Sequence, residues 1–469
     1  MSTSDSPSRR NHHLVWLVAG AFFMELLDST VITTALPQMA QSFHTQPIHL
    51  STGVSAYLLA LAVFIPLSGW MADRFGPRQV FGGALLIFSF ASVLCSLSTS
   101  LLSFTAARIL QGLGGAMMVP VGRMAVLRTT PKERLVQAIA MLTWPALSAP
   151  VLGPPLGGFI TTHWSWHWIF LLNVPFGLIG FALTLYLVDG EPGGRRPFDW
   201  SGFLFSGLGC CALMYGCDLA SQTPFDGLQV ALSALVGAVA LFVALHHLKR
   251  TPHPLIELDA LNIPTFFLTM RGGSLFRMAI NSAPFLFPLM FQLAFGFNAT
   301  HSGLLLLALF AGNLCMKTAT TPLMRAWGFR SVLIANGILV ALGFLLAMLL
   351  TPTTPTPLIM LVLFFTGLSR SMQFTALSTF SFCDVPQDKM SGASTLSSIL
   401  VQMSSGLGVA LAAIALRIAS SAFPADGHGL SVAAFRAAFL AMAALSAFGL
   451  IDLFALSPNA GIRVSGHKA

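Results

Sequence analysis

A few charged side chains lie inside long apolar runs of this sequence, and they are the first candidates for chemistry. Glu25 and Asp28 stand three residues apart, so on a helix both carboxylates lie on one side. Arg108 and Gln111 share the same interval in a later run. Placing an acidic side chain or an arginine in an apolar medium costs free energy. Such side chains are therefore candidates for binding protons or polar ligands there.

A second set of polar side chains lies in the C-terminal half. Asn281 follows Arg277 by one helical turn, and Arg370 and Gln373 repeat the Arg-x-x-Gln spacing of the first half. Arginine binds a carboxylate through two parallel hydrogen bonds, so these residues suit a substrate cavity. The predicted cavity residues are Trp144, Arg277, Asn281, Arg370 and Gln373.

The elements that must position these side chains follow from an unusually apolar composition. Of the 469 residues, 55% are hydrophobic and only 9% are charged, whereas a soluble protein carries about 25% charged residues. Such a chain cannot cover a water-exposed surface, so its solvent must be lipid. The composition predicts an all-α polytopic membrane protein.

The sequence contains fourteen runs long enough to cross a bilayer, for which a helix needs about 20 mostly apolar residues. The runs are 14–36, 51–71, 80–97, 101–122, 137–160, 168–188, 200–220, 227–246, 265–295, 302–322, 331–350, 358–380, 392–416 and 437–456. Because this number is even, both termini must lie on the same side of the membrane.

The distribution of basic residues predicts which side that is. The loops that share a side with the termini hold most of the Lys and Arg between the runs, and the opposite loops hold only Arg417 and Arg436. Basic loops stay in the cytoplasm. We therefore expect a multi-pass protein of the inner (plasma) membrane with both termini in the cytoplasm.

Several other function classes lack their characteristic features. The net charge of +8 is compatible with nucleic-acid binding, but its placement follows the orientation rule just described. The sequence has no G-x-x-x-x-G-K phosphate loop and no H-E-x-x-H helix. His163 and His167 have metal-ligand spacing, but they lie in a Trp-rich segment typical of headgroup anchoring. We expect no enzyme activity, nucleic-acid partner, metal or cofactor, with a proton gradient as the energy source.

The sequence also repeats itself. Residues 69–81 read GWMADRFGPRQVF, and residues 322–333 read PLMRAWGFRSVL, with a matching aromatic-Gly pair and trailing Arg. The Arg-x-x-Gln motif occurs two runs after each segment. The order implies two six-helix halves, and repeated halves are typical of secondary transporters with a site at the repeat interface.

The repeat predicts the organisation of the chain. The two bundles are assigned to residues 14–190 and 261–456, and residues 191–260 form a linker with two extra helices. Residues 1–13 and 457–469 are expected to be cytoplasmic tails.

Five segments resemble motifs of a known family. Residues 69–78 are similar to the signature loop of the major facilitator superfamily. LLDSTVITTALP (26–37), RILQGLGGAMMVP (108–120), LGPPLGG (152–158) and WSWHWIFLLNVPFG (164–177) resemble motifs of its fourteen-helix drug:proton antiporter branch, and within it of MdtD-type bacterial exporters. The resemblance implies a major facilitator fold, with two six-helix bundles plus two extra central helices, and proton-coupled export of small molecules.

The same resemblance implies a cytoplasmic gate at the signature loop, whose charges would form and release contacts as the protein changes state. Its residues are Gly69, Asp73, Arg74, Gly76 and Arg78. The alternative is a solvated loop that only orients the protein in the membrane.

A glycine- and proline-rich stretch in the fifth run resembles the antiporter motif of that branch. Its residues are Pro150, Gly153, Pro154, Gly157 and Gly158. Ala149, Gly153 and Gly157 are four apart, which makes one flat face for close helix packing. We interpret the stretch as a close-packed, bendable surface between the two halves.

The proton-coupling set is predicted to be Glu25, Asp28, Arg108 and Gln111. Asp28 and Arg108 lie roughly 12 Å and 10 Å from the outer ends of their runs, at about 1.5 Å per residue, so they are able to pair. Asp28 is the first candidate for binding the proton and Glu25 the second. The alternative is a static ion pair that locks two helices.

The charges inside the runs leave the substrate class open. The basic residues are Arg108, Arg271, Arg277, Lys317 and Arg370, and the acidic ones are Glu25, Asp28, Asp218 and Asp452. Lys317 lies close enough to the end of its run to reach the membrane surface.

Our first interpretation is a proton-driven, multidrug-type antiporter that works by alternating access, with a small-molecule substrate, protons and the bilayer as its partners, and functional as a monomer. The alternative is an exporter of organic anions or metabolites that uses the arginine-rich cavity. A passive channel is a further class.

Overall fold

The computed structural model describes residues 7–129, 135–188, 190, 197–221, 226–252, 254–386, 389–424 and 430–456. Side chains are left undescribed at 7–10, 127–128, 135–140, 143–147, 221, 321 and 390–391. The described residues form helices joined by turns and loops, and no β-strand occurs among them.

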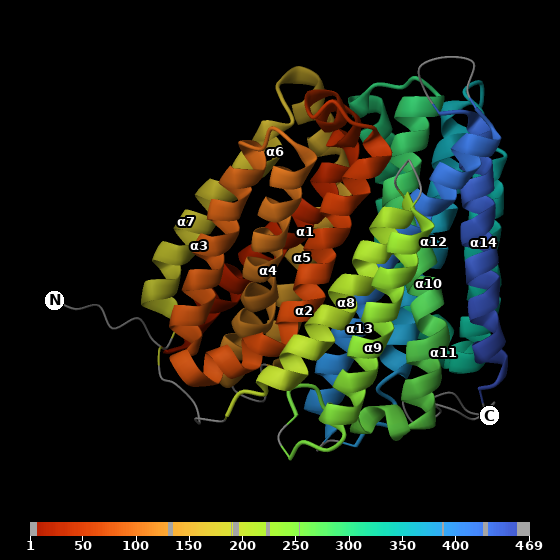
Figure 1. Cartoon of the computed structure of the whole chain (residues 1–469). Helices are drawn as coiled ribbons and strands as arrows, with labels where there is room; N and C mark the ends of the chain where they lie inside the picture. The colour runs from red at the N-terminus through yellow and green to blue at the C-terminus, as the bar shows by residue number, and fades with distance from the viewer. Residues whose placement is uncertain are drawn as a thin grey trace.

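The N-terminal bundle occupies one side of the molecule, drawn from red to yellow in Figure 1. It contains α1 (Pro7–Ser42), α2 (Ser51–Phe75), α3 (Pro77–Ser96), α4 (Leu101–Thr129), α5 (Leu135–His163), α6 (His167–Leu171) and α7 (Asn173–Leu187), with the 3-10 helix η1 (Pro47–Leu50) before α2. The short α6 and the longer α7 together form one apolar span.

The C-terminal bundle occupies the other side, drawn from green to blue, and two further helices pack in front of the junction (Figure 1). The bundle contains α10 (Pro264–Leu289), η4 (Met290–Ala294), α11 (Ala299–Met348), α12 (Thr356–Phe380), α13 (Met390–Ala422) and α14 (Val432–Phe454). The helices at the junction are α8 (Trp200–Ser221) and α9 (Gly227–Leu248), followed by the 3-10 helix η3 (Asp259–Asn262).

The expected spans correspond to these helices. Among the described residues, 13 segments are long and apolar enough to cross a membrane, and α5, with 29 residues, covers the remaining expected run. Several helices extend beyond the expected runs, and α1, for example, begins at Pro7 rather than at the first apolar residue. Arginine favours helices almost as well as leucine does, so α1 starts before its apolar stretch.

The repeated turn has the same backbone shape in both halves. Gly76, between α2 and α3, has a φ of 86°, and Gly328, inside α11, has a φ of 72°. Glycine adopts positive φ at little cost, whereas other residues do not. Gly328 therefore divides α11 into two crossing parts, as Gly76 separates α2 from α3.

The motif in α5 makes close contacts in two directions. A Cβ atom at Gly153 or Gly157 would overlap Thr30 or Val31 of α1, in the same bundle. A Cβ atom at Gly158 would overlap the carbonyl oxygen of Ala299 on α11, in the other bundle. The flat face of Gly153 and Gly157 thus holds the N-terminal bundle together, and Gly158 supplies a contact between the halves.

The two ends of the bundle differ in how the halves meet. We call them the Gly76 end and the Trp166 end, the latter marked by α6 at the top of Figure 1. Towards the Trp166 end, Gly303 of α11 packs on the backbone of Pro154. Ser55 Oγ of α2 donates to the carbonyl oxygen of Gly406 on α13 at 3.2 Å. The halves are therefore joined on this side.

Gly158→Ala is expected to open the Trp166 end, because its Cβ would push α11 away from α5. The reporter is a cysteine at Gln292, whose Nε2 donates to the Thr34 carbonyl across the bundles at 3.2 Å, in a chain with its six native cysteines replaced by alanine. A membrane-impermeant maleimide should label Gln292→Cys several-fold faster in the variant. Gly20→Ala is the matched control, since a Cβ there meets nothing within 4 Å. Equal labelling rates in both variants would show that Gly158 does not hold this end closed.

Candidate functional site

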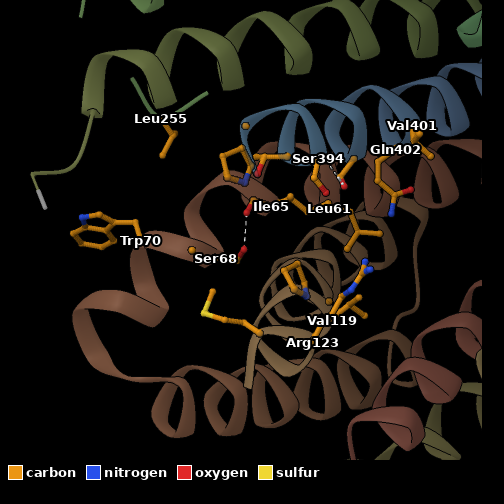
Figure 2. A pocket seen from close by; sticks show the side chains of 18 of the residues that line it. Leu61, Ile65, Ser68, Trp70, Val119, Arg123, Leu255, Ser394, Val401 and Gln402 are labelled. Carbon is orange, nitrogen blue, oxygen red and sulfur yellow. Dashed lines mark hydrogen bonds between the residues drawn. The ribbon is translucent and has the colours of Figure 1, made fainter. Parts of the chain in front are cut away.

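A cavity of about 1220 Å³ lies between the two halves and reaches the Gly76 end. Figure 2 shows Ser394 and Gln402 of α13 above Leu61 and Ile65 of α2, with Val119 and Arg123 of α4 below them. Near the Gly76 end the lining continues over Trp70, Asp73, Phe198, Asp199 and Leu255. The cavity is therefore built by both bundles and by the linker.

Asp28 lies in a buried network inside the N-terminal bundle. Its Oδ2 accepts from Arg108 Nη1 at 2.7 Å. Its Oδ1 accepts from Gln111 Nε2 at 2.9 Å and from Asn173 Nδ2 at 2.7 Å. All four side chains are buried. The predicted pair of Asp28 and Arg108 is present, and the carboxylate is fully supplied with donors.

Further residues extend this network to two more helices. Ser92 Oγ of α3 accepts from Gln111 Nε2 at 2.9 Å and from Asn173 Nδ2 at 3.3 Å. The Arg108 guanidinium lies over the Tyr57 ring of α2, 4.1 Å from its centre. The network thus ties α1, α2, α3, α4 and α7 together. We did not predict Asn173, although an amide in an apolar run was a usable signal.

Glu25 faces the cavity instead. It lines the cavity wall next to Gly115 of α4 and is 8% exposed. Its Oε2 is buried and has no hydrogen-bond partner among the described residues. Three residues turn a helix by about 300°, so Glu25 and Asp28 point about 60° apart. That angle is enough to place one carboxylate in the cavity and the other inside the bundle.

Arg370 faces the cavity from the C-terminal half. Its Nη2 lies 3.5 Å from Asn281 Oδ1, and its Nη1 is buried without a partner among the described residues. Asn281 also lines the cavity and donates to Ser405 Oγ at 2.8 Å. The Arg370 guanidinium lies 5.7 Å from the centre of the Phe310 ring. Arg370 is therefore held at the wall with donors left over.

Lys317 is a second cation on the same wall. Its Nζ donates to Thr375 Oγ1 at 2.7 Å, and both Lys317 and Asn313, one turn earlier on α11, line the cavity. Thr375 follows Arg370 by five residues on α12, about 7.5 Å along the axis. We did not include Lys317 in the predicted cavity, because its position in the run suited a side chain that reaches the membrane surface.

The remaining predicted cavity residues lie elsewhere. Arg277 is fully buried, with Nη1 4.0 Å from the Sδ of Met270, and it is absent from the cavity lining. Gln373 is also buried away from the lining and accepts from Asn336 Nδ2 at 2.9 Å. Trp144 belongs to the part of α5 whose side chains lie outside the described residues.

The signature loop lies at the Gly76 end of the cavity. Gly69 and Asp73 line the cavity, and Arg74 is exposed. Arg78 Nε donates to the Val188 carbonyl at 2.8 Å, which joins the start of α3 to the end of α7. Gly76 provides the positive φ that reverses the chain.

Asp199 organises the linker at the same end. Its carboxylate accepts from the Gly202 backbone N–H at 2.8 Å, from His247 Nε2 at 2.8 Å and from the Leu255 backbone N–H at 3.2 Å. Burial acts to raise the pKa of Asp199, but these hydrogen bonds outweigh it and hold the pKa below its usual value. The charged carboxylate thus ties the start of α8 to the end of α9 and to the segment leading into α10.

The two histidines with metal-ligand spacing have other contacts. His163 Nδ1 lies 3.0 Å from the Phe159 carbonyl oxygen. The His167 ring stacks on Trp166, and its Nδ1 lies 2.6 Å from Ser165 Oγ. Within the described part of the chain, no group of three or more His, Cys, Asp or Glu side chains is arranged to hold a metal.

The chain resembles curated proteins along most of its length. It is 36% identical over 449 residues to "Putative multidrug resistance protein MdtD" of Escherichia coli O6:H1 (strain CFT073), covering 95% of this chain and 94% of the relative. The protein of the same name from Pectobacterium carotovorum (strain PC1) is 36% identical over 428 residues, covering 91% of this chain and 92% of the relative.

A solved structure has the same fold, and a family pattern identifies the group to which the chain belongs. An auto-inhibited peptide transporter of the POT family superposes with a TM-score of 0.69 at 15% identity, covering 94% of this chain and 96% of that one. This likeness shows the fold alone. The sequence pattern of the Major Facilitator Superfamily matches residues 18–409. With two helical bundles around a central cavity, this multi-pass membrane protein belongs to the major facilitator superfamily of transporters.

Proposed function

We propose that this protein is a proton-coupled antiporter of the inner membrane that exports small molecules by alternating access. The basic loops support a cytoplasmic location for the Gly76 end. With that orientation, the cavity reaches the cytoplasmic side and the halves are joined at the other. The names of the relatives, multidrug resistance proteins, support export rather than import.

The observation that carries the proposal is the state of Glu25. A buried carboxyl group with an unpartnered oxygen faces the cavity at membrane depth. An ionised carboxylate is disfavoured in such a place unless a cation or a proton neutralises it. A side chain of this kind exchanges a proton for a positively charged or hydrogen-bond-donating group of the substrate.

This proposal assigns the proton to Glu25, the second candidate from the sequence, rather than to Asp28, the first. Asp28 is sealed from the cavity and accepts from Arg108, Gln111 and Asn173. Its charge is already balanced, so the network suits a fixed cross-link of the N-terminal bundle. Glu25 forms no salt bridge with a described residue, and its buried Oε2 accepts no hydrogen bond from one.

The exchange of substrate for a proton follows if both bind at the Glu25 carboxylate. In the state open to the cytoplasm, Glu25 loses its proton and the substrate takes its place. After the halves rock, a proton from the more acidic outer side replaces the substrate, which leaves. Because one carboxylate serves both partners, each excludes the other, and such exclusion is what links two fluxes in opposite directions.

Inverted membrane vesicles test this function. Respiration acidifies the vesicle interior, and acridine orange reports the pH gradient by fluorescence quenching. We expect ethidium, benzoate or 4-(aminomethyl)benzoate, tested in turn, to release the quenching in vesicles with the protein and not in vesicles without it. If all three compounds only equilibrate down their own gradients, whatever the pH gradient, the protein is a passive channel and the proposal fails.

An exporter of organic anions is the second candidate, and a specific observation favours it. Arg370 and Lys317 line the same wall of the cavity, and no described carboxylate forms a salt bridge with either of them. This candidate predicts that benzoate alone is active in the vesicle assay. Opposite that wall, Glu25 opposes a purely anionic ligand.

A further inference from the structure

We propose that the substrate of this cavity is a zwitterion with an apolar body. Its anionic group binds Arg370 and Lys317 on the C-terminal half, and its ammonium group binds Glu25 on the N-terminal half. The inference rests on the proposed function, since it takes the cavity to be the transport site. It names the charge class of the substrate, which export alone leaves open.

The C-terminal wall is built for an anion. Arg370 Nη1 is buried without an acceptor among the described residues, and its Nη2 has only a long contact of 3.5 Å to Asn281. A guanidinium carries five donors in a planar fork. Lys317 uses one donor on Thr375 and keeps two more. Together with Asn313, these side chains offer a carboxylate more donors than it needs.

The part of the N-terminal wall around Glu25 has the opposite character. Arg123, a cation on the same wall, lies eight residues after Gly115 on α4, about 12 Å along the helix axis. Around Glu25 the lining consists largely of apolar residues and glycine, among them Leu61, Ile65, Gly115 and Val119. In these surroundings Glu25 Oε2 accepts no hydrogen bond from a described residue. An ammonium group supplies three donors and a compensating charge, while the apolar part of the same ligand covers the neighbouring side chains.

The two walls do not neutralise each other. Among the described residues, no ion pair joins Glu25 to Arg370 or Lys317. A ligand with a single charge therefore satisfies one wall and leaves the other charge desolvated and unpaired, which is unfavourable. An anion would face Glu25, and a cation would face the two basic side chains. A zwitterion satisfies both walls at once.

The size of the space argues for an apolar body between the two charges. Ligand pockets usually measure roughly 300–1,000 Å³, and this cavity, at about 1220 Å³, lies just above that range. A molecule with adjacent charges and no body would not reach from one half to the other. A ligand that spans the halves also has contacts on both moving bodies.

Substrate exchange across proteoliposomes tests the charge class without any proton gradient. The probes are 4-(aminomethyl)benzoate and phenylalanyl-phenylalanine, each compared with its methyl ester, a cation, and its N-acetyl derivative, an anion. We expect at least one zwitterion to exchange roughly tenfold or more faster than both of its derivatives, the scale of one charge-assisted hydrogen bond.

Variants assign each charge to its wall. Arg370→Gln should remove the advantage of the zwitterion over its ester, and Glu25→Gln should remove its advantage over the N-acetyl derivative. Lys317→Gln serves in place of Arg370→Gln if that variant fails to fold. Arg436→Gln is the matched control, because Arg436 is exposed and donates to the Met348 carbonyl far from the cavity lining.

The outcomes separate this inference from the proposed function. If a singly charged derivative exchanges as fast as the zwitterion for every probe, or no zwitterion exchanges, the inference is overturned. If a zwitterion exchanges fastest but an imposed pH gradient does not drive its transport, the inference is upheld and proton coupling is overturned. A response to the pH gradient with ethidium alone upholds coupling and overturns the zwitterion.

Discussion

Glu25→Gln is expected to reduce proton-driven transport to the level of vesicles without the protein. Glutamine keeps the size of the side chain but cannot exchange a proton, so the two fluxes are no longer linked. The measurement is the release of acridine orange quenching in inverted vesicles by a compound that the unaltered protein transports. Exchange of an N-acetyl anion without a gradient should persist, because that ligand binds on the opposite wall.

The same variant should fold normally. No described residue donates a hydrogen bond to Glu25 Oε2, so the substitution removes no partner. The thermal midpoint of the detergent-solubilised protein, followed by size-exclusion chromatography, should stay equal or rise. Proton-driven transport at the unaltered rate in Glu25→Gln would remove Glu25 from the coupling role.

Asp28→Asn is expected to have the opposite profile, a loss of stability. It leaves the buried Arg108 guanidinium without its counter-charge and weakens a site that now accepts from three side chains. Breaking a buried ion pair on one side costs about 3–5 kcal/mol. The thermal midpoint should therefore fall well below that of Glu25→Gln, which makes the same chemical change three residues earlier on α1.

A double variant checks the cause of that loss. If an unpaired charge destabilises Asp28→Asn, then Asp28→Asn combined with Arg108→Gln should recover part of the thermal midpoint, since no buried charge is left alone. Equal midpoints for Asp28→Asn and Glu25→Gln would contradict the cross-linking role. Loss of proton-driven transport in a fully stable Asp28→Asn would return the proton to Asp28, the first candidate from the sequence.

The membrane architecture could be predicted from the sequence because it depends on local properties, namely the hydrophobicity and the spacing of residues that are close together along the chain. Apolar runs of about 20 residues define spans whatever they pack against. The aromatic-Gly pairs at Gly76 and Gly328 predicted the repeat, and both glycines have the positive φ that such a turn needs. The Asp28–Arg108 pair followed from equal depth, since helical rise is constant.

Tertiary structure decided which of these groups meets the cavity. Helical periodicity places Glu25 and Asp28 about 60° apart, but it does not say that α4 and α7 cover Asp28 while Glu25 faces the open space. Arg277 and Asn281 are one turn apart, yet only Asn281 lines the cavity. A side chain is covered by whichever helix packs on its turn, and that helix changes from one turn to the next. The sequence of a single helix does not say which helix this is.

The same reason explains Lys317 and the motif in α5. A long lysine side chain reaches either the membrane surface or the cavity, and its contact with Thr375 of α12 selects the cavity wall. Small residues predict close packing without naming the partner. The sequence by itself thus determined the spans, their repeat and the candidate charges. Only the packing of α1 and α11 against different faces of α5 decided that Gly157 stays within one half and Gly158 joins the two.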